Sequence, residues 1–302
     1  MKKNTKKSVM FFMPFAICWV LFWGIPFLYG CYMSVHNISM TKGNRGFVGI
    51  DNYIALFSKS SMYSVEFISG LKNTLLFVII SVPALVLVAL GLALIVDNLP
   101  EKLKGLYRTI YFTPYAISVT AVSSVFLWMF NGNGGFINNL LIRMKVIDAP
   151  MSWLEAQPFA WIVILLSTVW WTVGYNMLLF INGLNSIDGA LYEAASVDGA
   201  NFWIRFRYII IPGLKNVISY VLLTSIIASF NLYGQANLIT RGGPSQSTRP
   251  LIMVIYDTIL KKNNLGVGCS MALVMGVIVM AFAVCQQMLS KEKAEIKEVN
   301  GK

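Results

Sequence analysis

The stretch of sequence that decides the fold is "LYEAASVDGANFWIRFRYIIIPGLKN", Leu191–Asn216, which carries both acidic and basic residues between two long apolar segments. The overlapping stretch "SIDGALYEAASV" predicts a short helix, and Ser186 or Asp188 can cap its first turn. Gly199 can take a positive φ that strains other residue types. "NFWIRFRYIII" predicts a second, amphipathic helix that ends or bends at Pro212. The stretch therefore predicts a helix–turn–helix between two apolar helices.

The composition places the chain in a membrane. Of its 302 residues, 57% are hydrophobic and only 12% are charged, and the mean hydropathy is +0.66. A soluble domain carries about 25% charged residues. No metal site is expected, because the cysteines lie in apolar runs without metal-binding spacing and the chain has a single histidine. The chain is therefore expected to be an all-α integral membrane protein.

Six segments are long and apolar enough to cross a membrane. A hydrocarbon core of about 30 Å needs roughly 20 apolar residues in a helix. The predicted spans are residues 9–32, 74–96, 109–130, 159–181, 218–236 and 267–288, which together form one transmembrane domain over residues 1–302. The first apolar segment is too long for a signal peptide and lacks a cleavage site of small residues. Kinks are expected where prolines lie inside these spans.

The distribution of lysine predicts the orientation of the chain. The first seven residues, "MKKNTKK", contain four lysines, which favours a cytoplasmic N-terminus. Six spans then place the C-terminus in the cytoplasm too, and residues 186–212 form a cytoplasmic loop. This topology, in a bacterial inner or plasma membrane, explains the net charge of +11 better than nucleic-acid binding does. We therefore expect a multi-pass protein with both termini inside.

Motifs that would supply energy or catalysis are missing from the sequence. No Asp, Glu, Lys or Arg lies in the central part of any predicted span, which disfavours a proton-coupled carrier. The sequence has no phosphate-binding P-loop and no HExxH helix, so we expect no enzymatic activity in this chain. A pathway energised by another protein is favoured. Two alternatives stay open, a secondary transporter of a neutral solute and a membrane scaffold without a pathway.

Two polar stripes mark a candidate pathway. Thr224, Ala228, Asn231 and Gln235 in the fifth span, and Thr168, Trp171, Thr172 and Tyr175 in the fourth, follow helical spacings that place each set on one face. Polar groups facing lipid cost free energy, so both faces are expected to point into the bundle. The predicted substrate contacts are Thr168, Trp171, Tyr175, Thr224, Asn231 and Gln235. The alternative is interhelical packing, worth roughly 0.6 kcal/mol for each hydrogen bond.

The opening stretch also resembles a known motif. "EAASVDGANFWIRFRYIIIP" is similar to the EAA motif of permease subunits of ABC importers, and its Asp-Gly-Ala form resembles that of carbohydrate-uptake permeases of the maltose and multiple-sugar type. Further blocks look like the same family in the same order: "FVGIDNYIALF" (47–57), "NTLLF" (73–77), "YRTIYFTPYAIS" (107–118), "FNGNGGFINNLL" (130–141) and "ITRGGPSQSTRPLIMVIY" (239–256). The resemblance implies the type I ABC importer permease fold.

The resemblance further implies that ATP binding and substrate passage are carried out by different subunits. Residues Glu193, Ala194, Ala195, Asp198 and Gly199 would form the helix and turn that dock onto a separate ATPase, with a charge-assisted contact from Glu193. Two such ATPase subunits would bind ATP and Mg, while this chain binds no cofactor. A second, homologous permease would complete the pathway as a heterodimer, and an extracytoplasmic solute-binding protein would deliver a sugar or oligosaccharide.

Overall fold

The computed structural model describes the backbone of residues 2–300 and the side chains of residues 10–288. The chain divides into two compact units, unit 1 (residues 1–69 and 253–277) and unit 2 (residues 70–252 and 278–302). The side chains of the N-terminal lysines, from which the orientation was predicted, lie outside the described residues. The orientation of the termini therefore stays a prediction.

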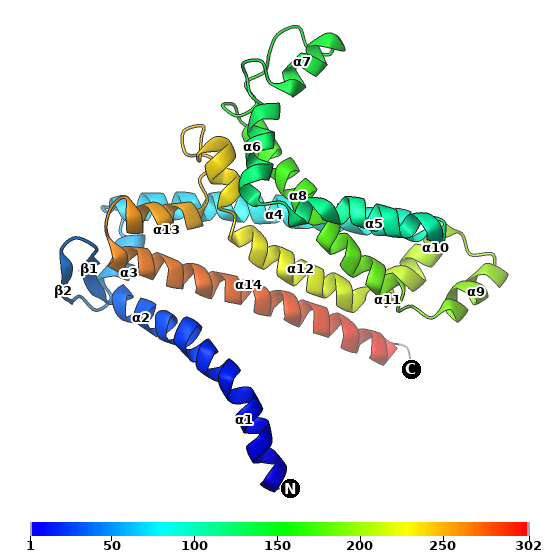
Figure 1. Ribbon diagram of the computed structural model, residues 1–302, viewed down its shortest axis with the longest axis horizontal. Helices are drawn as coiled ribbons and strands as arrows, with labels where there is room; N and C mark the ends of the chain where they lie inside the picture. Colours follow the sequence, from blue (N-terminus) through cyan, green and yellow to red (C-terminus); the bar gives the residue numbers. More distant parts are fainter. Residues whose placement is uncertain (1, 301–302) are drawn as a thin grey trace. The chain divides into compact units, whose positions relative to one another are not determined.

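Unit 1 contains the N-terminal helices, a hairpin and parts of three further helices (Figure 1). In chain order these are α1 (Lys2–Trp19), a π-helical turn η1 (Val20–Gly24), α2 (Ile25–Ser34), β1 (His36–Ser39), β2 (Gly43–Phe47), α3 (Asp51–Phe57), the start of α4 (Met62–Asp97), most of α13 (Leu251–Leu260) and the first part of α14 (Leu265–Asn300). No residue in the most apolar window of Met10–Ser34 is buried, so its side chains are free to contact lipid.

A polar cluster joins the hairpin of unit 1 to the helices around it. The strands are antiparallel, with His36 opposite Phe47. Asn52 donates hydrogen bonds to the carbonyl oxygens of Ser34 (2.8 Å) and His36 (3.0 Å), and the side-chain oxygen of Asn263 accepts a hydrogen bond from the amide of Met40 at 2.7 Å. No sequence pattern considered above predicts this hairpin, because the side chains that hold it come from distant segments.

Unit 2 contains the elements that build both candidate sites. In chain order these are the rest of α4, α5 (Glu101–Ala116), α6 (Val119–Met129), α7 (Phe136–Arg143), α8 (Phe159–Leu184), α9 (Gly189–Val197), α10 (Phe202–Arg205), η2 (Phe206–Ile210), α11 (Ile211–Gly213), α12 (Lys215–Phe230), η3 (Ala236–Thr240) and the end of α14. Helix α8 contacts α5, α6 and α12 (Figure 1). Their shared core includes the fully buried side chains of Met177, Phe180 and Leu214. Helix α8 is thus the central element of the unit.

Two sharp bends interrupt the helices of unit 2, one inside a predicted span and one just before another. Helices α5 and α6 meet at 94° within the predicted span 109–130, close to Pro114, where a kink was expected. Pro114 lies in the last turn of α5, and the Ser118 side chain accepts a hydrogen bond from the amide of Ala121 to cap α6. A second bend of 68° separates Phe202–Gly213 from α12, next to Pro212, where the sequence predicts that the amphipathic helix ends or bends. By contrast, α4 continues through Pro83 without a break.

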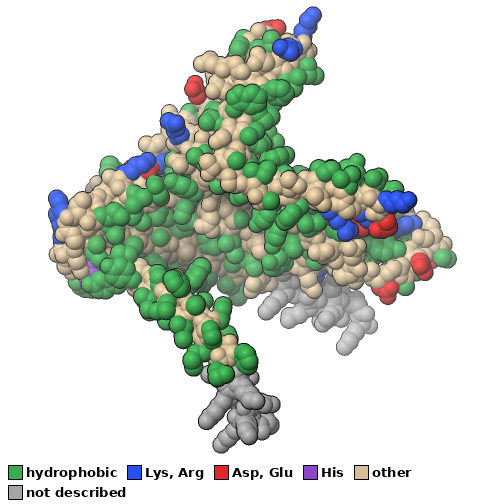
Figure 2. All heavy atoms as spheres, viewed as in Figure 1, with side chains coloured by type: hydrophobic (Ala, Val, Ile, Leu, Met, Phe, Trp, Pro, Cys, Tyr) green, Lys and Arg blue, Asp and Glu red, His purple; other side chains and the backbone are tan. Residues whose placement is uncertain are grey.

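The helices offer between four and six membrane crossings. Four described helices are long and apolar enough by themselves, and each bent pair adds one if it forms a single span. The six candidates overlap the six predicted segments in order. In Figure 2 charged side chains of unit 2 gather at the end where α5 begins and α9 lies, and again on α7, while hydrophobic side chains cover much of the surface between them. This distribution suits a multi-pass membrane protein.

Candidate functional site: a helical loop and an internal cavity

The predicted helix–turn–helix is present in the structure as α9 and the helical segment that begins with α10. Asp188 caps α9, with its carboxylate accepting a hydrogen bond from the amide of Ala190 at 3.0 Å. Gly199 has a φ of +70°, so the chain turns where a side chain would be strained. Asn201 then caps α10 through the amide of Ile204 at 3.0 Å. Asp188 therefore caps the helix, and Gly199 turns the chain, at the positions that the sequence predicted.

Most of α9 and of the turn that follows it is exposed to solvent. Glu193, Ala194, Asp198 and Gly199 are exposed, and Ala195 is half-buried. Two apolar side chains of α9 also point outward, Leu191 at 52% and Val197 at 88% exposure. The guanidinium of Arg205 stabilises the turn by donating a hydrogen bond to the carbonyl of Ala200 at 2.9 Å. The five predicted coupling residues thus form one accessible, pre-shaped surface.

The base of this loop is closed by two glycines. A Cβ added to Gly213 would lie 2.7 Å from Cδ1 of Ile187, and one added to Gly183 would lie 2.7 Å from Cδ2 of Leu214. Carbon atoms normally approach no closer than about 3.5 Å. The chain therefore enters and leaves the loop through close contacts in which any larger residue would displace a neighbouring side chain, and these contacts join the loop to α8 and α12.

Tyr192 is the side chain of α9 that packs against the core of unit 2. Burial, together with the negative charge of Asp97, raises the pKa of the Tyr192 hydroxyl above its usual value. Both effects disfavour the tyrosinate form, so the side chain stays neutral at physiological pH. Tyr192 thus links the loop of residues 186–212 to the end of α4 as an uncharged side chain.

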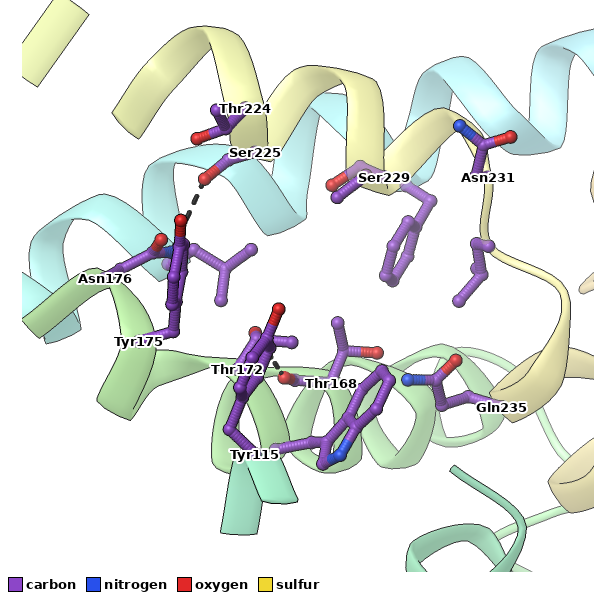
Figure 3. A pocket seen from close by; sticks show the side chains of 15 residues that line it. Tyr115, Thr168, Thr172, Tyr175, Asn176, Thr224, Ser225, Ser229, Asn231 and Gln235 are labelled. Carbon is purple, nitrogen blue, oxygen red and sulfur yellow. Dashed lines mark hydrogen bonds between the residues drawn. The ribbon is translucent and has the colours of Figure 1, made fainter. Parts of the chain in front are cut away.

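An internal cavity of about 410 Å³ lies between α4, α8 and α12 (Figure 3). Helix α8 contributes Thr168, Trp171 and Tyr175, and Thr224 comes from α12. Asn231, Gln235 and several further side chains complete the lining, and all six predicted pathway residues are among them. No Asp, Glu, Lys or Arg among the described residues lines the cavity. The cavity therefore offers hydroxyls and amides without a formal charge.

The three threonine hydroxyls of the cavity are bonded back to their own helices. Thr168 donates to the carbonyl of Ile164 (2.8 Å), Thr172 to that of Thr168 (2.7 Å) and Thr224 to that of Tyr220 (3.0 Å). A hydroxyl that donates to the backbone still has lone pairs with which to accept. These three side chains can therefore accept hydrogen bonds from a hydroxylated ligand without losing the bonds that hold them.

Aromatic rings form one side of the cavity. The ring of Tyr115, from α5, stacks on Tyr175 with centroids 5.1 Å apart and lies 6.1 Å from Trp171. The indole nitrogen of Trp171 donates to the carbonyl of Ile117 at 2.9 Å, at the bend between α5 and α6. This bond fixes the plane of the indole. Flat, fixed rings beside hydroxyl acceptors suit a ligand with both apolar and hydroxylated faces.

The predicted helical face of the fifth span is only partly correct. Helix α12 ends at Phe230, and Asn231 occupies its C-cap with its side-chain amide donating to the carbonyl of Ile227 at 2.9 Å. Beyond it the chain leaves the helix, so residues 218–236 are not one continuous span. Asn231 and Gln235 still line the cavity because the chain turns along its wall.

Four polar lining residues lie outside the two predicted polar stripes. Tyr115 comes from another span, and no spacing within the fourth or fifth span could indicate it. Ser225 and Ser229 lie beside predicted positions on α12, and Asn176 follows Tyr175 on α8. An amide such as that of Asn176 in an apolar run is a recognisable signal in the sequence.

An apolar helical bundle with an uncharged internal cavity and an exposed helical loop defines the class as a membrane transport subunit. Comparison with family models identifies the family. Residues 52–293 match the model described as "Binding-protein-dependent transport system inner membrane component". The chain belongs to this family of permease subunits, as the EAA motif indicated.

Several curated relatives are similar over most of their length. The chain is 34% identical to the lactose transport system permease protein LacF of Rhizobium radiobacter over 70% of each chain. It is 31% identical to the sulfoquinovosyl glycerol transport system permease protein SmoG of Agrobacterium fabrum, over 89% of this chain and 85% of that one. It is 27% identical to the arabinooligosaccharides transport system permease protein AraP of Bacillus subtilis, over 93% and 87%.

A solved structure confirms the fold. The structure superposes on a chain of a bacterial ABC transporter involved in the import of the acidic polysaccharide alginate, with a TM-score of 0.82 and 20% sequence identity. The match covers 96% of this chain and 98% of that chain. The fold is therefore that of a type I ABC importer permease.

Proposed function

We propose that this chain forms half of the translocation pathway for a neutral sugar or short oligosaccharide in an ATP-driven importer. The observation that carries the proposal is the cavity of about 410 Å³, which is lined by hydroxyls, amides and aromatic rings and by no charged side chain among the described residues. Sugars present hydroxyl edges and apolar ring faces, and this lining is complementary to both. The printed names of relatives, including lactose and arabinooligosaccharide permeases, support the same substrate class.

Energy for transport would come from outside this chain. In the proposal, the loop of residues 186–212 docks onto one of two ATPase subunits, which hold ATP and Mg. Its exposed residues Glu193, Ala194 and Asp198 would contact that subunit, while Gly199 shapes the turn. The absence of a P-loop from the sequence supports this division.

The proposal needs two further partners, because this chain would form only half of the pathway. A second, homologous permease would face the cavity and form a heterodimer with this chain, and an extracytoplasmic binding protein would deliver the sugar. Both termini would lie in the cytoplasm, which a reporter fused after Lys302 tests by its location. Inhibition of uptake by vanadate, together with co-purification of an ATPase, would separate this proposal from a secondary transporter and from a scaffold.

Two substitutions test the cavity directly. Trp171→Ala removes an aromatic plane and Asn231→Ala removes an amide, and neither residue lies in the coupling loop. We expect altered sugar selectivity or affinity, with expression and basal ATPase activity unchanged. If both variants only lower the amount of assembled transporter, these residues are structural and the pathway lies elsewhere.

A further inference from the structure

A second cavity, of about 260 Å³, lies along the same chain segment that leaves the central cavity. Asn231, Leu232 and Gln235 line the central cavity, and the segment 238–241 lines the second one a few residues later. On the proposed topology this second cavity is on the outer side of the membrane. We call it the outer cavity. Its position suggests a place that a substrate passes before it reaches the central cavity.

One wall of the outer cavity is fixed by a buried asparagine. Asn138, which is 2% exposed, donates hydrogen bonds to the carbonyls of Asn131 (3.3 Å), Gly132 (3.2 Å) and Met151 (3.0 Å). Its side-chain oxygen accepts from the amide of Met151 (3.1 Å) and from the indole nitrogen of Trp153 (2.8 Å). Asn131, Gly132 and the neighbouring Ser152 line the cavity. This wall is therefore ordered before any ligand binds.

The opposite end of the lining is held by the turn that follows η3. The Thr240 hydroxyl donates to the carbonyl of Ala236 at 3.0 Å, and the amide of Gly242 donates to the same carbonyl at 3.2 Å. Between them, Arg241 has a φ of +53°, a left-handed conformation that is uncommon for a residue other than glycine. Such conformations cluster at ligand sites. The turn presents Arg241 to the cavity.

The chemistry of the lining favours a neutral, hydroxylated ligand. The carboxylate of Glu155 can accept two hydroxyl hydrogen bonds, and the guanidinium of Arg241 can donate two in parallel. Their charges cancel, so the site offers no net attraction to an anion or a cation. Ser152 and Thr240 add hydroxyls, while leucine and isoleucine side chains supply apolar surface. The cavity volume lies below the roughly 300 Å³ at which pockets for drug-sized ligands begin.

We propose that the outer cavity binds one ring of a neutral sugar ahead of the central cavity. The carboxylate of Glu155 and the guanidinium of Arg241 hold its hydroxyls, and the apolar side chains contact its ring face. This inference rests on the proposed sugar permease function. It deepens that function by assigning a second sugar site, with one carboxylate and one guanidinium, to the entry side of the pathway.

Protection of an introduced cysteine from labelling tests the outer site. The full-length chain is expressed with its transporter partners in membrane vesicles, with its four native cysteines, none of which lines either cavity, replaced by serine. Ser152→Cys reports the outer cavity, and Thr224→Cys reports the central one. Asp148→Cys, an exposed position that lines neither cavity, controls for general changes in labelling.

We expect neutral sugars to slow the maleimide labelling of Ser152→Cys severalfold. The probes are lactose, maltotriose and arabinotriose, and the anion glycerol 3-phosphate should protect much less. Adding Glu155→Gln or Arg241→Gln should abolish protection of Ser152→Cys while Thr224→Cys remains protected. Labelling of Asp148→Cys should not respond to any probe.

The other outcomes overturn the inference in distinguishable ways. Protection of Thr224→Cys without protection of Ser152→Cys would eliminate the outer site and leave the proposed function standing. If no sugar protects either cysteine, both the outer site and the sugar permease proposal fail. Protection of Ser152→Cys by a sugar-free binding protein, and not by sugar, would show that the outer cavity contacts the binding protein and does not bind sugar.

Discussion

The close contact between Gly213 and Ile187, where the loop of residues 186–212 meets the membrane helices, gives a sharp prediction for the proposed coupling role. Gly213→Ala would place a methyl group 2.7 Å from Cδ1 and 2.8 Å from Cγ1 of Ile187. Ordinary contacts between carbon atoms are about 3.5–4.0 Å, so one side must move by roughly 0.8 Å. Overpacking of this kind costs about 1–3 kcal/mol. The displaced loop should also pass less of its movement to α12.

A second substitution tests whether this contact is the cause. Ile187→Ala removes Cδ1 and both γ carbons, which should cost about 2 kcal/mol, at the low end for such truncations because Ile187 is only half-buried. In the double variant, the methyl group of Gly213→Ala occupies part of the space vacated at Ile187. The double variant should therefore be more stable than the sum of the two single effects allows, by roughly 1 kcal/mol or more.

The assay measures sugar uptake per ATP hydrolysed in proteoliposomes, alongside the thermal stability of the purified complex. Gly213→Ala should lower both, and the double variant should recover part of each. Gly189→Ala is the matched control, since no atom lies within 4 Å of its added Cβ and it begins α9 at an unstrained position. If Gly213→Ala behaves like Gly189→Ala in both measurements, the contact between Gly213 and Ile187 does not transmit movement from the loop to α12, and the reasoning is wrong.

Three further predictions concern individual side chains. Gly199→Val forces a β-branched residue to a φ of +70°, which costs about 1–3 kcal/mol, so uptake should fall at unchanged membrane abundance whereas Gly199→Asn should retain more of it. Asn138→Ala leaves the indole N–H of Trp153 unpaired, at about 1–3 kcal/mol, so limited proteolysis should cut the loop between α7 and α8 faster. Since burial and Asp97 raise the pKa of Tyr192, its contribution to stability should be full below pH of about 10 and decline above it. Asp97→Asn should lower that pKa in a spectrophotometric titration, and Tyr192→Phe should remove the difference between the two titrations.

The sequence by itself determined the features that depend on local pattern. Asp188 caps α9 and Gly199 turns the chain because both effects act within a few residues. The apolar segments follow from hydropathy, since a lipid core requires long apolar helices wherever they pack. The EAA motif identified the family for the same reason, as its residues are contiguous in the chain. The polar stripe of Thr168, Trp171 and Tyr175 also follows from helical spacing alone.

Only the tertiary structure decided where helices break and which distant residues meet. The bend after α5 is held by the bond from Trp171 to Ile117, which joins residues 54 positions apart. Asn73 donates to the carbonyl of Arg249 across 176 positions. Tyr115 joins the cavity from a separate helix, and Asn231 lines it after α12 has ended. Such contacts depend on packing between segments far apart in the chain. The periodic spacing of residues within one segment does not indicate that packing.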